Sequence, residues 1–356
     1  MTVESLRTNV LKGIKYIYNK TYIQYMNFIK YSIDFLTLHR EYDVNDTILI
    51  FGAPRSGTTW LMEILSCIPR YKTVFEPLHR YWYPQVSNLN IPYRPYLSPS
   101  QENPNIHNYL KNVFSGKVIS RIPRYRFINF PQRIYANKLI VKFVRANRLI
   151  PWILKRFDVK AAYFIIRHPC ATIASQMKSK ELVTGYVRKK DGQREDYIPT
   201  KNEILKEIEL IDIFEDRKDE IFKLLNNLYG PEEILAFIWA VDHYVPLYYL
   251  RKDPPLSKKI YLVFYENLVI DYHNEIKNIF DFINENIPDK VYELKRTPSI
   301  TTHDKNYIGT TKQLEKWKRK LSTQEIQRIL NITSNIFELD FYDESILPIY
   351  TDILKL

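Results

Sequence analysis

Small and hydroxyl-bearing residues after an apolar run form the first candidate binding site in this sequence. Gly52, Gly57, Thr58 and Thr59 have the spacing of a phosphate-binding loop, in which N–H groups at a helix N-terminus converge on an anion. Thr58 stands where a nucleoside triphosphatase of this type has its lysine. The pattern therefore predicts a phosphate cradle that lacks the lysine for a triphosphate.

A second phosphate site is predicted about 110 residues further along the chain. Arg167 ends an apolar run, Pro169 is suited to the first position of a helix, and Ser175 follows two helical turns later. An arginine can bind a phosphate through two parallel hydrogen bonds. Two such loops in one chain indicate a ligand with an anionic group at each end.

Three further residues are candidates for acid–base chemistry. Glu76 precedes Pro77 at a short strand end, where we expect proline to hold it in an extended conformation. Its carboxylate is then a candidate general base, and His79 is the second candidate. Lys142 interrupts an apolar run, and a lysine is costly to bury there unless it meets an anion.

The elements that would position these residues alternate between strands and helices. Such alternation predicts an α/β fold of the P-loop-like type, with three layers and a central parallel sheet flanked by helices. Helices are expected at about residues 105–114, 202–226, 231–250 and 272–283. Four buried parallel strands are predicted at about residues 47–51, 138–144, 161–166 and 259–264.

We expect two regions along the chain. Residues 1–45 should form a basic amphipathic helical segment that packs on the domain or on a second subunit, or lies on an anionic membrane surface. Residues 46–356 should form a single domain. Within it, the loop-rich stretch at about 80–135 should shape the acceptor site, because such loops lie over the carboxyl ends of the strands.

The composition fits a folded basic protein. Apolar residues make up 45% of the chain, which is enough for a large core. The net charge of +12 suits an anionic ligand, nucleic acid or an anionic membrane, or reflects composition drift alone. Cys67 and Cys170 give no disulfide framework or metal-ligand set, so we expect no metal. Without a signal peptide or membrane-spanning run, the protein is expected to be cytoplasmic, or peripheral at a membrane.

The stretch from Pro54 to Trp60 resembles a known loop. It is similar to the 5′-phosphosulfate loop of sulfotransferases that use 3′-phosphoadenosine 5′-phosphosulfate (PAPS), and Arg167-His168-Pro169 with Ser175 resembles their 3′-phosphate site. The resemblance implies that the cradle holds the 5′-phosphosulfate, that Trp60 lies against adenine, and that Arg167 and Ser175 bind the 3′-phosphate. The cradle residues are Arg55, Ser56, Gly57, Thr58 and Thr59. Tyr265 stands where the family has an adenine-contacting tyrosine, and it is equally compatible with a place in the core.

The same resemblance implies catalytic roles. Cytosolic sulfotransferases carry Lys-x-His on the strand that here holds Lys142, but this chain has Val144 in place of that histidine. The base must then come from elsewhere, and Glu76 is best placed. Lys142 and Arg55 would neutralise charge on the sulfuryl group. Phe75-Glu76-Pro77-Leu78 resembles a stretch of Golgi-type carbohydrate sulfotransferases.

The predicted function is transfer of a sulfuryl group from PAPS to a hydroxyl of a carbohydrate or glycolipid-like acceptor. No nucleic-acid partner is expected, and the oligomeric state is left open. The first alternative is a P-loop kinase or NTPase with an unusual loop. The second is a non-catalytic basic module that binds nucleic acid or membrane. Lys305 and Lys318 are further candidates for donor contacts, and residues from about 340 onward are expected to be a packed tail without chemistry.

Overall fold

A computed structural model describes most of the domain and little of the N-terminal segment. The described residues are 40–118, 134–177, 187–190, 193–299, 308–335 and 337–354, with eight helical residues between positions 21 and 35. The predicted segment 1–45 and its membrane contact therefore lie largely outside the described residues. Lys305 and part of the stretch 80–135 do so as well.

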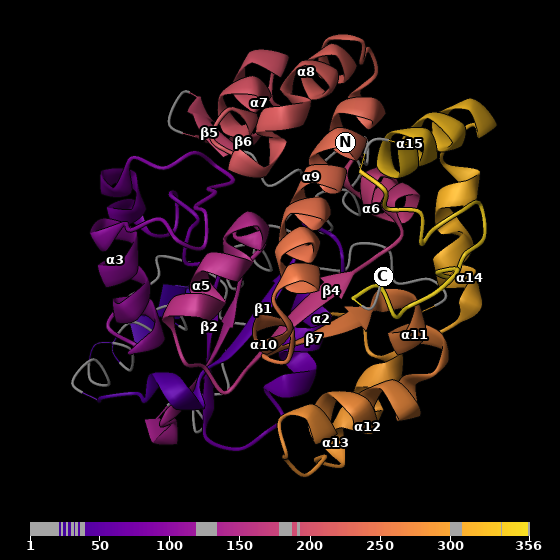
Figure 1. Ribbon diagram of the computed structural model, residues 1–356. Coiled ribbons are helices and arrows are strands. Elements are labelled where there is room, and N and C mark those ends of the chain that lie inside the picture. Colours follow the sequence, from indigo (N-terminus) through magenta and orange to yellow (C-terminus); the bar gives the residue numbers. More distant parts are fainter. Residues whose placement is uncertain are drawn as a thin grey trace, which may run out of the picture.

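A five-stranded, all-parallel sheet forms the centre of the fold (Figure 1). The strand order is β2-β3-β1-β4-β7. The strands are β1 (Ile48–Gly52), β2 (Tyr71–Phe75), β3 (Lys138–Lys142), β4 (Ala161–Ile166) and β7 (Ile260–Phe264). The P-loop-like α/β fold is confirmed, and the four predicted core strands are β1, β3, β4 and β7. The fifth strand, β2, was expected only as a short strand end before Glu76, because Lys72 and Thr73 interrupt its apolar pattern.

Helices cover both faces of this sheet. Neighbouring residues of a strand point to opposite faces. On β4, the Phe164 ring stacks on His243 of α9 (Pro231–Lys252), with ring centroids 5.2 Å apart. The hydroxyl of the adjacent Tyr163 donates to the carbonyl of Ile279 in α12 (Tyr272–Phe282) at 2.6 Å. Thus α9 and α12 lie on opposite faces, which gives the predicted three layers.

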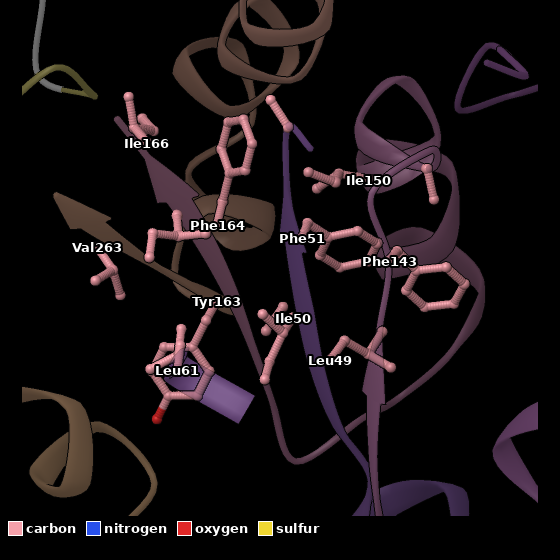
Figure 2. Packing of buried hydrophobic residues seen from close by; sticks show 14 of the residues in the cluster. Leu49, Ile50, Phe51, Leu61, Phe143, Ile150, Tyr163, Phe164, Ile166 and Val263 are labelled. Carbon is pink, nitrogen blue, oxygen red and sulfur yellow. The ribbon is translucent and has the colours of Figure 1, made fainter. Parts of the chain in front are cut away.

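The helix after β1 lies on the same face as α12. This helix, α2, spans Thr58–Leu65, and Figure 2 shows its Leu61 beside Ile50 and Tyr163. On the opposite face, the rings of Phe51 and Phe143 stack with centroids 5.3 Å apart (Figure 2). Apolar burial on both faces of β1 and β4 holds the loops at their carboxyl ends in place.

The remaining elements surround this centre. The predicted helix 202–226 is two helices separated by the 3₁₀ segment Asp212–Arg217, in which Phe214 is buried. An antiparallel pair, β5 and β6, is formed by Val187–Lys190 and Gln193–Asp196. The other helices are α3 (Pro104–Phe114), α5 (Ile150–Arg156), α6 (Pro169–Gln176), α7 (Lys201–Ile208), α8 (Lys218–Asn226), α10 (Pro254–Ser257), α11 (Tyr265–Ile270), α13 (Lys290–Glu293), α14 (Thr311–Leu314) and α15 (Thr323–Asn335).

A buried ion network ties the loop-rich stretch to the sheet. Asp242 of α9 pairs with Arg94 at 3.0 Å and with Arg148 at 2.8 Å, and Arg148 also pairs with Glu207 at 3.0 Å. All four side chains are buried. Removing one partner of such a network leaves an uncompensated buried charge, which is strongly destabilising. The network therefore fixes the loop after β3.

Among the described residues, none of the helices combines the length and the apolar character that crossing a bilayer would need. The cytoplasmic location stays a prediction.

Candidate active site

The loop after β1 has the backbone of a tight anion cradle. The Ser56 N–H donates to the Ala53 carbonyl at 3.1 Å. Arg55 and Gly57 both lie in the left-handed region, with φ of 72° and 105°. A Cβ atom at Gly57 would stand 2.5 Å from Cδ2 of Tyr265, so glycine is required there for conformation and for space. Thr58 and Thr59 then open α2, whose N-terminus favours negative charge.

The two predicted phosphate loops are in direct contact. Arg55 Nε donates to Ser175 Oγ at 3.1 Å, and Arg167 Nη1 donates to the Arg55 carbonyl at 2.8 Å. Gln176 Nε2 adds a bond to the Pro54 carbonyl at 2.9 Å. The parallel pairing of β1 with β4 brings the two strand ends together. One ligand can therefore touch both loops.

Two polar atoms at this junction fit a bound anion. In the part of the chain that the structure describes, Ser56 Oγ and Arg167 Nε are buried and have no hydrogen-bond partner. Buried donors are normally satisfied, and an orphaned one is costly. One donor lies in each loop. A ligand with a phosphate at each end would satisfy both.

Tyr265 lies between the loops. The Arg167 guanidinium lies over its ring, 4.4 Å from the centroid, and its hydroxyl accepts a hydrogen bond from Gln313 Nε2. Burial raises the pKa of Tyr265, so the hydroxyl stays protonated. The sequence left Tyr265 open between a core and a site role. In the structure its ring is buried and also forms one wall of the Gly57 turn.

Trp60 packs against the ring of Tyr265. Its indole Nε1 donates to the Leu294 carbonyl at 3.2 Å, and its ring packs on Tyr265 and Tyr272 with centroids 5.9 and 5.8 Å away. Trp60 therefore supports Tyr265 from behind. The adenine contact predicted for Trp60 stays a prediction.

The loop after β4, which is the predicted 3′-phosphate site and is called the 3′ loop below, is clamped from two directions. The buried Glu266 carboxylate accepts from the His168 N–H at 3.0 Å and from the Tyr342 hydroxyl at 2.7 Å. His168 Nδ1 accepts from the Cys170 N–H, and its Nε2 bonds the Asp343 carbonyl at 2.9 Å. Burial lowers the pKa of His168 to about 4, so the ring is neutral at physiological pH.

The predicted catalytic residues meet at the carboxyl end of β3. Lys142 Nζ lies 2.8 Å from Glu76 Oε1, and Arg145 Nη1 lies 3.0 Å from Glu76 Oε2. All three side chains are largely buried. The carboxylate is the anion that the sequence required for a lysine inside an apolar run, and each of its oxygens has its own cation.

The charge state of Glu76 follows from these partners. Burial alone would raise its pKa, but Lys142 and then Arg145 overcome burial and hold the pKa of Glu76 at about 2. A carboxylate with such a pKa is a weak proton acceptor. Glu76 is thus ionised, and its basicity is suppressed while Lys142 stays on Oε1.

The backbone of Glu76 differs from the expectation. Its φ is 48°, so the prediction of an extended residue before Pro77 was wrong. The Glu76 N–H donates to the Lys142 carbonyl at 2.7 Å and its carbonyl accepts from the His79 N–H, which forces a turn. The His79 ring stacks on Trp82, with centroids 3.8 Å apart.

Some site residues escaped the sequence interpretation. Arg145 was seen only as the end of a strand, although its place three residues after Lys142 offered a signal. Asn147, whose Oδ1 accepts the Gly52 N–H at 3.1 Å, gave none. Gln313 was also missed. The charge of Lys318 helps to lower the pKa of His168, and the ring of the adjacent Trp317 stacks on His168 at 4.5 Å.

The sulfotransferase domain family matches residues 45–332, which is most of the chain. The chain therefore belongs to this family of enzymes, which use PAPS as the sulfuryl donor. It is a sulfotransferase-domain protein. No curated protein matches it in sequence.

Solved sulfotransferase structures resemble this chain at low identity. The domain from the curacin biosynthetic pathway shares 17% identity at a TM-score of 0.43, covering 83% of this chain and 98% of that one. The sulfotransferase domain of the Synechococcus PCC 7002 olefin synthase shares 16% identity at a TM-score of 0.41, covering 82% of this chain and 94% of that one. Mouse sulfotransferase SULT7A1, solved in complex with PAP, shares 13% identity at a TM-score of 0.39, covering 85% of this chain and 90% of that one.

Proposed function

We propose that this protein moves the sulfuryl group of PAPS to a hydroxyl of a carbohydrate or glycolipid-like acceptor. The observation that carries the donor half is the direct contact between the two loops. Arg55 bonds Ser175, and buried donors of Ser56 and Arg167 are left without partners among the described residues. The carbohydrate half is supported by Phe75-Glu76-Pro77-Leu78, which resembles a stretch of Golgi-type carbohydrate sulfotransferases, and by the contact of Glu76 with Lys142 at 2.8 Å.

In this proposal the loop after β1 binds the phosphosulfate, and Arg167 with Ser175 binds the 3′-phosphate. Tyr265 and Trp60 hold the adenine side. Charge-assisted hydrogen bonds are worth about 1.5–3 kcal/mol each, so two bonds to the 3′-phosphate favour this donor by roughly three orders of magnitude over a nucleotide without it.

The proposed reaction is an in-line transfer. Glu76 takes the proton of the acceptor hydroxyl, whose oxygen forms a bond to sulfur. The bond from sulfur to the bridging oxygen breaks, and its electron pair stays on the 5′-phosphate of the product, 3′-phosphoadenosine 5′-phosphate (PAP). Lys142 and Arg55 stabilise the charge that develops on the oxygens. A positioned general base of this kind contributes about 10²–10⁴-fold to the rate.

Calorimetric titration with PAP and with ATP plus Mg²⁺ tests the donor. We expect PAP to bind tightly and ATP weakly. Tight ATP binding would instead support the kinase alternative, and binding of neither would support the non-catalytic module.

Labelled PAPS incubated with separate glycan and glycolipid fractions tests the acceptor. Wild-type protein should label one fraction, and Glu76→Gln should lower labelling by about 10²-fold or more. If Glu76→Gln kept more than about a tenth of the activity, the role of base would pass to His79.

A further inference from the structure

Lys142 has two anionic partners in the chemistry proposed above, namely Glu76 and the donor. In the structure its ammonium is bonded to Glu76 Oε1 at 2.8 Å and lies 3.9 Å from the centroid of the Phe75 ring. In sulfuryl transfer it would have to face the anionic end of the donor. To face the donor as well, the ammonium must give up or share its contact with Oε1, because one charge then serves two anions.

The sheet places Lys142 within reach of the donor loop. Lys142 ends β3, pairs in register with Ile50 of β1, and is followed by Phe143, whose N–H donates to the Ile50 carbonyl at 2.7 Å. Gly52, where the loop begins, is two residues beyond Ile50. A lysine side chain is a flexible stem with a point charge, so it can turn from one anion to another.

Arg145 makes such a change tolerable for Glu76. It bonds Oε2, whereas Lys142 bonds Oε1. When Lys142 leaves, the carboxylate keeps a charged partner and its orientation, and only Oε1 becomes free. That oxygen is then available for the proton of an acceptor hydroxyl.

We propose that Glu76 and the phosphosulfate end of the donor compete for Lys142, so that donor binding removes Lys142 from Oε1 and frees the base. This inference rests on the proposed function, and it adds a step that keeps the base inactive until the donor binds. Without donor, Glu76 is neutralised by two cations and cannot activate an acceptor. With donor, the same lysine that meets the sulfuryl group has released the base.

The competition can be measured by binding alone, without a known acceptor. The probes are PAP and PAPS, titrated into the full chain. Glu76→Gln removes the competing carboxylate, so we expect it to tighten binding of at least PAPS by about tenfold. Glu76→Asp keeps the negative charge and tolerates the left-handed backbone, but its shorter side chain reaches Lys142 less well. It should therefore also tighten binding, by less than Glu76→Gln does.

A double-mutant cycle separates competition from general repulsion. In a Lys142→Met background, the gain from Glu76→Gln should vanish, since no lysine remains to be released. If Glu76 merely repelled the donor, the gain would persist in that background. Glu220→Gln changes the net charge equally at an exposed surface pair on α8 and should leave both affinities unchanged.

The outcomes separate the inference from the function. Wild-type protein that binds neither PAP nor PAPS would end the proposed function and this inference together. Wild-type binding with no tightening in Glu76→Gln and Glu76→Asp would overturn the competition alone. A gain that survives in Lys142→Met would overturn it as well.

Discussion

Left-handed backbone at single residues shapes both halves of the site. Arg55 and Gly57 turn the loop after β1, the predicted donor loop, and Glu76, the predicted base, makes a turn that brings its carboxylate to Lys142. Non-glycine residues in this region are strained, and they persist where their surroundings hold them. Here Arg55 is held by bonds to Ser175 and Arg167, and Glu76 by its two cations.

The first prediction concerns Gly57. Gly57→Ala should lower the free energy of unfolding by about 1–3 kcal/mol and weaken PAP binding by about tenfold or more, because the loop must shift and misalign its donors. Gly116→Ala is the matched control, since Gly116 also has a positive φ and a Cβ there would lie 2.4 Å from a tyrosine ring. It should cost similar stability but leave calorimetric PAP binding intact. Equal binding losses in both variants would contradict a donor role for the loop.

The second prediction concerns Arg167. Arg167→Ala should weaken PAP binding by about 10- to 100-fold, the loss expected for one charge-assisted hydrogen bond. Adenosine 5′-phosphate, which lacks the 3′-phosphate, serves as the control ligand and should lose far less. Calorimetry with both nucleotides compares the losses. An unchanged PAP affinity would remove the 3′-phosphate assignment.

At the scale of elements, the C-terminal tail has a positioning role that its sequence did not indicate. Tyr342 and Asp343 contact Glu266 and His168, which brace the 3′ loop from behind. The tail is packed as expected. Its contacts reach the residue next to Arg167, so it helps to fix the predicted 3′-phosphate site.

This role gives the third prediction. Tyr342→Phe removes the hydroxyl bond to Glu266, which should loosen the His168 turn and weaken PAP binding by about three- to tenfold. Tyr350→Phe is the control, because the Tyr350 hydroxyl bonds Asp340 on the exposed side of the same tail. Binding titrations of both variants would show whether the tail acts on the site. Identical affinities would limit Tyr342 to a structural role.

For the whole molecule, one buried carboxyl group should make stability depend on pH. Burial raises the pKa of Glu275 on α12 to about 7, and a hydrogen bond from Tyr261 only partly opposes it. The folded pKa is therefore above the unfolded value of 4.5. The stability that this group contributes is complete below pH 4.5 and is lost as the pH rises through 7.

The fourth prediction follows from that sign. Glu275→Gln should raise the free energy of unfolding at pH 8 by on the order of 2 kcal/mol and change it little at pH 4.5. Urea unfolding of wild type and variant at both pH values measures the difference. A gain that is equal at the two values would show that ionisation of Glu275 is not the cause.

The sequence by itself determined the fold class and the two loops. Apolar β-branched strands followed by Gly52, Gly57 and Pro169 specify strand–loop–helix units through local conformational rules, and these rules need no tertiary contact. The family membership follows from the same motifs. Edge strand β2 was expected only as a short strand end, because its pattern is interrupted by charge at Lys72.

Only the tertiary structure decided how the charges meet. Glu76, Lys142 and Arg145 lie at the carboxyl ends of β2 and β3, which are adjacent only because these strands pair in register, with Phe75 opposite Lys142. The contact of Arg55 with Ser175 likewise depends on β1 lying beside β4. Pairing between strands far apart in sequence is not encoded in local spacing, and neither is the pKa of a carboxylate that takes its value from partners brought by folding.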